Sequence, residues 1–461
     1  MDTKRKAENL QRRIRKHTGQ VDSFSFFNLL TSPQLFSKVE DLLPEYRERK
    51  FPPTETLSMF LSQAMSADRS CQNVVNTTAV QKSISGLSPH STHTGSYCKA
   101  RQRLPRTLLS ELVRYTSTLI DQPLSQDWHW QGRPVRLIDG TTVTMPDTAQ
   151  NQEAYPQQGG QKPGLGFPIC RLVGIICLAS GSVVNAAMGP FKGKGADEQT
   201  LLRSLLDSFD SGDIVVGDAY YSCYFLLAEL MARGVDVVFE QFGARRQKTD
   251  FRTGQKLGSK DHLIVYRKPV KKPDWMTEQH YREAPDTLTI RELKVGNKLL
   301  VTTMLSPKEA SKASLKQLYK DRWHVELDLR NIKTTMGMET FSCQSPEMIE
   351  KEMWVYLLAY NLIRLVMAQS AVLADILPRQ ISFKHSLQIW LAFRQQQGDI
   401  NDDESLVLLC VLIAENTVGH RPGRIEPREV KRRPKPYKVL SEPRNKVREA
   451  IRKYGHPEKI K

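Results

Sequence analysis

The fold of this 461-residue chain is decided by the segment Pro134-Val135-Arg136-Leu137-Ile138-Asp139-Gly140. Its aliphatic and β-branched residues predict a strand that ends at Asp139-Gly140, and Thr141–Met145 extends it. The preceding residues, up to about residue 130, have a helical pattern, with helices expected at 34–43, 54–65 and 106–120. The chain therefore changes from helical to α/β character at about residue 133.

Strand and helix patterns alternate after this segment. Two strand patterns joined by Ser180-Gly181 predict a hairpin. The following elements are a helix at 197–209, a strand at 214–216 that ends at Gly217-Asp218, a helix at 221–233 and a strand at 235–240. This order predicts an α/β domain. Residues 241–297 are strand-like and polar, which indicates a β-rich insertion before a strand at 298–304 returns to the sheet.

The charge of the chain favours a polyanionic partner. The net charge is +17 and the pI is about 9.5. Residues 421–461 hold 15 basic and 5 acidic residues, and the first 16 hold 7 and 2. Basic ends can be disordered, solubilising tails, but the excess continues over 240–298, with 14 basic and 8 acidic residues. This distribution favours a nucleic acid over a membrane surface.

Cysteine spacing and hydropathy exclude several other classes. The seven cysteines are scattered and form no Cys-x2-Cys pair, so we expect neither a zinc site nor a disulfide scaffold, and a reducing cytosol fits. Residues 1–16 are charged throughout and do not resemble a signal peptide. The apolar stretch Met353–Met367 contains Asn361 and Arg364 and is too short to span a bilayer, so it indicates a buried helix.

A helical pattern near residue 320 carries four polar residues on one stripe. At about 100° per residue, Arg322, Glu326 and Lys333 fall within about 60° of Tyr319, along about 21 Å. A carboxylate between a phenol and two cations suits a metal ligand in a site that grips a phosphate backbone. An amphipathic helix with an ordinary solvated face would give the same pattern.

Three carboxylates form the candidate catalytic group. Asp139 and Asp218 each follow a predicted strand, where ligands collect in open α/β sheets, and Glu326 lies on the downstream helix. If gathered, they would repel one another unless divalent cations lay between them. Two Mg²⁺ ions about 4 Å apart would stabilise the attacking and leaving oxygens of an in-line phosphoryl displacement.

Each of these residues also has a structural explanation. Asp139-Gly140 is a common turn pair, and Asp218 could cap the next helix. Other carboxylates are equally eligible by position: Asp147, Asp213, Asp321 and Asp328. Composition does not choose among them.

Three further segments attract attention for their charge or glycine content. Alternating cations lie near an expected loop, at Lys99, Arg101 and Arg103. This pattern is expected of a segment that contacts DNA, and an exposed basic turn would look the same. The Gly/Gln-rich stretch 157–166 is too polar to pack. The glycine-rich stretch 189–195 lacks Gly-Lys-Ser/Thr and is not a Walker A loop.

The Tyr-Arg-Glu-Lys signature at Tyr319, Arg322, Glu326 and Lys333 resembles that of the IS4 family of bacterial DDE transposases. Asp139-Gly140-Thr141 is similar to that family's first catalytic segment, and Gly217-Asp218-Ala219-Tyr220-Tyr221 to its second. The resemblance runs from about residue 90 to 435, including Lys99-Ala100-Arg101 and Arg432-Arg433-Pro434-Lys435. Many members have Arg where this chain has Ala219, which puts a contact by that position in doubt.

The resemblance implies an RNase H-like catalytic domain, interrupted by the β-rich insertion within the 108 residues from Asp218 to Glu326. It implies that Asp139, Asp218 and Glu326 hold two Mg²⁺ or Mn²⁺ ions. The expected reaction is nicking at the ends of an insertion sequence, after which the 3′-OH attacks the opposite strand, giving a hairpin, or target DNA. Tyr319, Arg322 and Lys333 would hold phosphates. Trp275 is a candidate to hold a flipped base, although a lone Trp in a β region is more often core.

The resemblance also organises the whole chain. We expect a helical DNA-binding region at 1–130, a catalytic domain formed by 131–240 and 298–345, the insertion at 241–297, a helical region at 346–420 and a basic tail at 421–461. Expected partners are terminal inverted repeats and target DNA, bound by a dimer in a synaptic complex, with no membrane, in the bacterial cytoplasm at the nucleoid. The alternatives are a nuclease of the same fold without strand transfer and a domesticated DNA-binding protein without chemistry.

Overall fold

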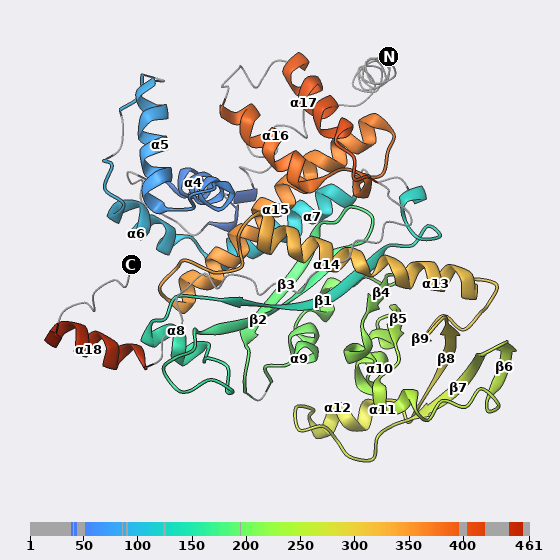
Figure 1. Cartoon of the computed structure of the whole chain (residues 1–461). Coiled ribbons are helices and arrows are strands. Elements are labelled where there is room, and N and C mark those ends of the chain that lie inside the picture. Colours follow the sequence, from blue (N-terminus) through green and yellow to red (C-terminus); the bar gives the residue numbers. More distant parts are fainter. Residues whose placement is uncertain are drawn as a thin grey trace.

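The computed structural model (Figure 1) describes residues 38–39, 41–43, 51–84, 86–88, 91–122, 126–193, 195–395, 403–419 and 442–454. Half of the expected helix at 34–43, the stretch 432–435 and much of the basic tail lie outside the described residues.

A mixed sheet, nine-stranded in the described part of the chain, forms the centre of the molecule, in the order β3-β2-β1-β4-β5-β9-β8-β7-β6. β1 is antiparallel to β2 and parallel to β4, which is in turn parallel to β5. β9, β8, β7 and β6 continue the sheet as antiparallel neighbours. The strands are β1 Val135–Thr144, β2 Ile169–Cys177, β3 Val183–Pro190, β4 Ile214–Gly217, β5 Asp236–Glu240, β6 Gln255–Gly258, β7 Asp261–Arg267, β8 Thr287–Val295 and β9 Lys298–Thr302.

β1 extends well beyond its parallel neighbour, which confirms the expected extension into 141–145 and corrects the expectation that Asp139 lies at the end of a strand. β4 pairs with β1 only as far as Leu137, whereas β2 pairs with β1 as far as Thr144. Asp139 is therefore in the middle of the strand, and Asp139-Gly140 is not a turn. Within the described residues, the edge of β1 that faces β4 has no strand partner from Ile138 to Val143, before Thr144 bridges to Thr340, and this leaves room for side chains from other elements.

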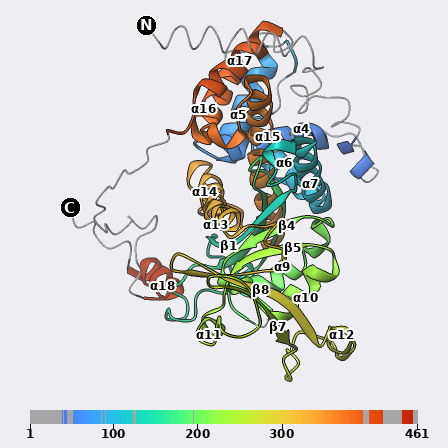
Figure 2. The same ribbon diagram turned by 90° about the vertical axis from the view of Figure 1, so that its right-hand side faces the viewer.

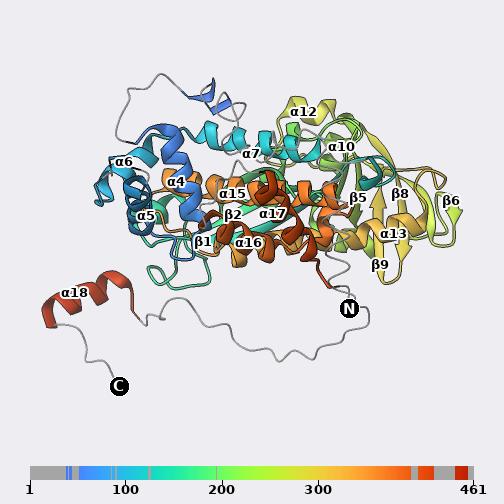
Figure 3. The ribbon, with the colours of Figure 1, turned by 90° about the horizontal axis from the view of Figure 1, so that it is seen from above.

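Helices cover both faces of the sheet. One apolar core packs α7, α13, α14 and α15 with Leu137, and a second packs α9 and α10 with Ile138 on the opposite face (Figures 1 and 2). Seen from above, α16 and α17 lie over α15, and α4 to α6 group at one end (Figure 3). The helices are α4 Pro53–Met65, α5 Cys71–Ile84, α6 Gly95–Arg103, α7 Arg106–Asp121, α8 Ala149–Ala154, α9 Glu198–Arg203, α10 Tyr224–Ala232, α11 Gly243–Arg246, α12 Glu278–Glu283, α13 Lys312–Asp321, α14 Trp323–Arg330, α15 Pro346–Ala374, α16 Phe383–Gln395, α17 Asp403–Glu415 and α18 Arg444–Tyr454.

α15 is the central buried helix. By length and composition alone it could cross a membrane, but 89% of its most apolar window is buried inside the protein. Its polar residue Asn361 is fully buried, and its amide donates to the carbonyl oxygens of Val113 and Val183 while accepting from the Val183 N–H. These bonds tie α7 and β3 to α15, which is the structural role expected of a satisfied buried amide.

The helix expected across residues 319–333 is interrupted twice. Arg322 separates α13 from α14, and residues Asn331–Thr335 form a π-helical turn, in which the Met336 N–H donates to the Asn331 carbonyl oxygen. The wider turn changes the angular spacing beyond Asn331, so the ideal 100° step does not hold to Lys333. Similarly, the helix expected at 197–209 is α9 followed by a short 3₁₀ turn.

A fully buried carboxylate fixes α14 to its neighbours. Asp328 accepts hydrogen bonds from Tyr360 (3.0 Å) and Arg364 on α15, and from Arg379 (2.6 Å). Arg379 also donates to the carbonyl oxygens of Leu178 and Cys177, just after β2. The network therefore joins α14, α15 and the end of β2 in one charged cluster.

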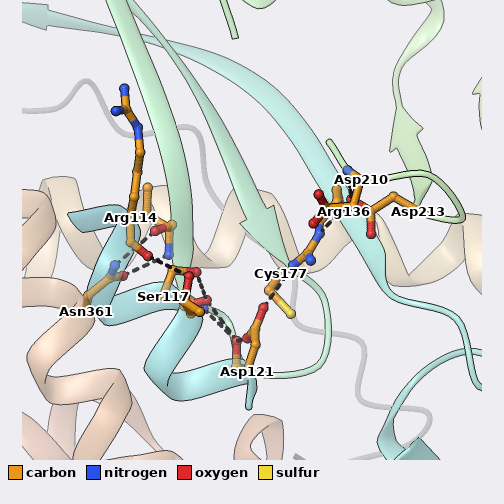
Figure 4. A network of polar contacts seen from close by, with 12 residues as sticks. Arg114, Ser117, Asp121, Arg136, Cys177, Asp210, Asp213 and Asn361 are labelled. Carbon is orange, nitrogen blue, oxygen red and sulfur yellow. Dashed lines mark hydrogen bonds and ion pairs between the residues drawn. The ribbon is translucent and has the colours of Figure 1, made fainter. Parts of the chain in front are cut away.

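A second polar network lies where β1 and β4 begin, at the opposite end of these strands from the candidate site (Figure 4). Arg136 pairs with Asp121 on α7 (2.9 Å) and with Asp213 before β4 (3.2 Å). Asp121 also accepts a hydrogen bond from Ser180 in the turn between β2 and β3. The network aligns the starts of the central strands, and within it Arg136 neutralises the charge of Asp213.

Replacing Asp328 with alanine should lower the free energy of unfolding by about 3 to 5 kcal/mol, because two buried guanidinium groups would lose their common carboxylate. Urea denaturation followed by circular dichroism measures this change. Asp321→Ala is the matched control: Asp321 is half-buried on α13 and accepts an exposed hydrogen bond from Gln317, so a change within about 0.5 kcal/mol is expected. Equal effects of the two substitutions would contradict the proposed role of the cluster.

Candidate functional site

The candidate site lies where β1 outruns β4. The Asp139 carboxylate accepts a hydrogen bond from the Gly140 N–H (2.8 Å) and lies 3.9 Å from the Arg322 guanidinium. Arg322 also donates to Glu326, one turn further along, at 2.8 Å. One guanidinium therefore bridges carboxylates from β1 and α14, which the sequence separates by almost 190 residues.

Asp218 immediately follows β4 and has a local structural role. Its side chain accepts from the Tyr220 N–H (2.8 Å) and caps the 3₁₀ turn Ala219–Tyr221. The capping explanation is therefore correct for the geometry of this residue. It does not exclude a second role, because the pKa of Asp139 is raised first by burial and, to a smaller extent, by the charge of Asp218.

A fourth carboxylate, Glu198 at the start of α9, reaches the same place from the other face of the sheet. It accepts from the Tyr221 hydroxyl (3.2 Å) and lies 3.7 Å from Arg171. Its carboxyl group covers Gly140 so closely that a Cβ atom there would lie 2.3 Å from its carboxyl carbon. Glycine after Asp139 is thus required for this approach. Sequence reasoning missed Glu198, and Asp197-Glu198 at an expected helix start was the only local signal.

The electrostatics of the site disfavour an ionised Asp139. Burial is the largest cause that raises its pKa, to about 6, and the negative charges of Asp218 and Glu198 add to it. The hydrogen bond from Gly140 and the charge of Arg322 act in the opposite direction. Burial likewise raises the pKa of Glu198. The site therefore holds more negative charge than its single bridging arginine compensates.

The other two members of the stripe contact the same side of the sheet. Tyr319 donates to Glu240 at the end of β5 (3.1 Å), and burial together with this carboxylate raises the pKa of its hydroxyl. Lys333 donates to the Thr141 hydroxyl (3.1 Å) and the Thr142 carbonyl oxygen (2.8 Å) on β1. The stripe thus faces the strands that carry the carboxylates, despite the two interruptions in the helix.

The competing carboxylates have other partners. Asp213 pairs with Arg136, Asp328 with Arg364 and Arg379, Asp147 with Arg444, and Asp321 with Gln317. Within the residues that the structure describes, no three His, Cys, Asp or Glu side chains are arranged to hold a metal ion as they lie. The oxygen-rich donor set nevertheless has the chemistry that Mg²⁺ prefers.

The basic segment 99–103 belongs to α6 and not to a loop, because it carries no helix breaker. Lys99 and Arg103 are exposed. Arg101 is buried, with its guanidinium 4.8 Å from the centre of the Phe60 ring and 5.1 Å from that of Tyr97. The expectation that Arg101 contacts DNA therefore conflicts with its position, since a packed helix turns one of three alternating cations inward.

Trp275 lies between β7 and α12. It is not a core residue, and its ring is held by contacts with other side chains. Its indole is 42% exposed, meets Phe225 edge to face, and lies 3.6 Å from the Arg203 guanidinium. The ring is accessible, and these two contacts hold it in place.

Residues 130–362 match the family described as "Transposase DDE domain". Over 415 residues the chain is 26% identical to the transposase InsG for insertion sequence element IS4 of Escherichia coli K12, covering 88% of this chain and 91% of that protein. It is 28% identical over 139 residues to the putative transposase InsZ of the same organism, covering 30% and 45%. The cryo-EM structure of the piggyBac transposase synaptic complex with hairpin DNA has a TM-score of 0.40 and 9% identity, covering 88% of this chain and 87% of that one.

Asp139→Asn should stabilise the protein near neutral pH when divalent cations are absent. The folded-state pKa of about 6 lies above the unfolded value of about 3.9, so ionisation costs stability as the pH rises through this window. We expect a gain of about 1 to 3 kcal/mol at pH 7.5 that disappears near pH 4. Thermal unfolding in EDTA at both pH values measures it. The exposed Asp274→Asn is the control, and a loss of stability at pH 7.5 would contradict the assignment.

Proposed function

Because the chain belongs to the IS4 family of DDE transposases, we propose that it catalyses cut-and-paste transposition of an insertion sequence. The reaction is hydrolytic nicking at the ends of the element, followed by attack of the freed 3′-OH. The observation that carries the proposal is the position of Arg322 between Asp139 and Glu326, with Asp218 close enough to act on Asp139. An ion pair with a purely structural role would not require two further carboxylates, Asp218 and Glu198, close to it.

The proposal includes an RNase H-like architecture for the catalytic part of the chain. The strand order β3-β2-β1-β4-β5 supports it, with an antiparallel hairpin on one side of β1 and two parallel strands on the other. The strands β6 to β8 lie within residues 241–297, where the family resemblance places an insertion, and β9 returns to the sheet beside β5. The division into five regions is part of the same proposal.

Asp139, Asp218 and Glu326 are the residues that would hold two Mg²⁺ or Mn²⁺ ions. Such ions supply charge neutralisation and stabilise the attacking and leaving oxygens in a phosphoryl displacement. The donor set fits, since the pKa of Asp139 is raised by burial and by neighbouring carboxylates whose repulsion a cation would relieve. Arg322 must then release Glu326, which frees its guanidinium for a phosphate.

The chain's own cations are placed to hold the DNA strand. Arg322 and Lys333 lie on either side of Glu326 along the helical segment, and Lys333 reaches β1 just after Asp139. Tyr319 offers a phenol beside the end of β5. We assign these three residues to phosphates near the scissile bond. Lys99 and Arg103 on α6, and Trp275 as a stacking partner for a flipped base, are proposed as more distant DNA contacts.

The partners follow from the reaction. Terminal inverted repeats and target DNA are the proposed substrates, with a dimer that holds two ends in a synaptic complex. We place the protein in the bacterial cytoplasm, at the nucleoid. A hairpin forms if the 3′-OH attacks the opposite strand and does not form if it attacks target DNA. The carboxylates do not decide between these two targets.

The test is Mg²⁺-dependent cleavage of DNA that carries the element's own ends. Asp139→Ala and Glu326→Ala should each lower cleavage by at least about a thousandfold while sparing binding in EDTA. Asp321→Ala is the matched control and should cleave normally. End-specific cleavage followed by joining to target DNA supports a transposase, and cleavage without joining identifies a nuclease. Specific binding without cleavage in Mg²⁺ or Mn²⁺ identifies a DNA-binding protein without chemistry.

Lys333→Ala should weaken DNA binding and reduce the slope of log affinity against log salt by about 0.9, because one phosphate contact is lost. Fluorescence anisotropy at several salt concentrations in EDTA measures the slope. Lys256→Ala removes the same charge from an exposed position on β6, the edge strand of the sheet, five strands away from β4, and should leave the slope nearly unchanged. Identical slopes for both variants would remove Lys333 from the phosphate contacts.

A further inference from the structure

The helix α18 touches the rest of the described protein through its first turn. None of its residues is buried, and it carries five cations, Arg444, Lys446, Arg448, Arg452 and Lys453, against the single acid Glu449. Figure 1 shows it beside α8, at the edge of the molecule. Because none of its residues is buried, this cationic helix does not contribute to an apolar core.

Its attachment is specific nonetheless. Arg444 pairs with Asp147 at 2.9 Å, and both side chains are mostly buried, at 16% and 19% exposure. The same guanidinium lies 4.1 Å from the centre of the Phe167 ring. Pro443 packs on Gly164, where an added Cβ would lie 3.3 Å from the proline side chain. We call these contacts the Arg444 latch.

The latch binds a loop that is well organised, although the sequence suggested a stretch too polar to pack. Gln157 accepts hydrogen bonds from the Gly164 and Gly166 N–H groups (3.0 Å each) and donates to the carbonyl oxygens of Gln161 and Lys162. One glutamine side chain therefore adds four hydrogen bonds to two backbone turns of the loop, in which the Gln161 N–H donates to the Gln158 carbonyl oxygen and the Leu165 N–H to that of Lys162.

A groove of about 680 Å³ opens between this loop and α18. Its lining includes amide groups from Gln158 and Gln161 and cations from Lys192 and Arg448. Lys192 comes from the glycine-rich stretch 189–195 and lies against Gly159, within 3 Å of the position of a Cβ there. Two glycine-rich loops and a basic helix thus meet in one polar groove, while the acid Asp147 is neutralised by Arg444.

The groove begins at Asp147, just after the end of β1, the strand that carries Asp139. Eight residues separate Asp139 from Asp147, which is at most about 26 Å of extended chain. This upper limit corresponds to at most about eight base pairs of duplex at about 3.4 Å per step. A duplex whose end is held at the carboxylates could therefore reach α18.

We propose that α18, the 157–166 loop and Lys192 form a binding surface for the phosphate backbone of duplex DNA within about eight base pairs of the cleaved end, held in place by the Arg444 latch. The inference rests on the proposed function for its substrate. Charge complementarity identifies the partner, since amides and cations both donate to phosphate oxygens. The latch orients the helix in advance, so less freedom is lost on binding.

The decisive variant is Asp147→Ala, because the Arg444 latch and the change in charge predict opposite effects of this substitution on DNA affinity. Removing an acid near DNA should tighten binding on charge alone, whereas releasing α18 should weaken it by about fivefold. Glu153→Ala on α8 removes the same charge from an exposed position nearby and is the control. Affinity is measured by anisotropy with a duplex of about 40 base pairs carrying the element's end, in EDTA, with the full-length protein. Arg448→Gln should lower the salt slope by about 0.9.

Hydroxyl-radical footprinting of the same complexes locates the contact. Protection of backbone positions beyond the end itself, up to about eight base pairs from the cleavage site, should be present in the wild type and lost in Asp147→Ala, with protection at the end retained. Tighter or unchanged binding by Asp147→Ala would overturn the inference, as would a change in oligomeric state in its place, which would mean that α18 contacts a second copy. Failure of the wild type to bind or cleave the ends would instead overturn the proposed function.

Discussion

The ion cluster around Asp328 is the constraint on which the site depends. This carboxylate is fully buried, so its two guanidinium partners must stay in place, and they belong to α15 and to the segment after it. Arg379 carries the constraint on to the end of β2. Glu326 lies two residues before Asp328 on the same short helix. The buried residue therefore fixes the helix, and the helix presents Glu326 and Arg322 to β1.

The unequal length of neighbouring strands supplies the space for the site. β1 continues past the end of its pairing with β4, so Asp139 lies in a rigid strand and still has an open side. Arg322 and Glu326 approach from one face, and Glu198 approaches from the other over Gly140. A site built this way combines a fixed backbone with convergent side chains, which suits chemistry that relies on positioning and charge. The same strand leads on to the groove beside α18.

Much of the fold was predictable from local patterns. The strands at β2 to β5, the hairpin turn at Ser180-Gly181 and the helices α4, α7 and α15 follow from periodicity and turn chemistry. The errors occur where tertiary contacts override a pattern. The strand did not end at Asp139 because β2 pairs with it as far as Thr144, and the helix near residue 320 was interrupted at Arg322 and by a π-helical turn. Arg101 turned inward because its helix packs on Phe60.

The sequence alone determined the family signature, the α/β order and the identity of the stripe Tyr319, Arg322, Glu326 and Lys333, because these depend on spacing along one chain. The sequence could not identify the catalytic carboxylates by position, because four other residues are equally eligible: Asp147, Asp213, Asp321 and Asp328. Only the tertiary structure gave each of them another partner. It alone brought Glu198 to Gly140 and Arg444 to Asp147, because contacts across so many residues depend on how the layers pack.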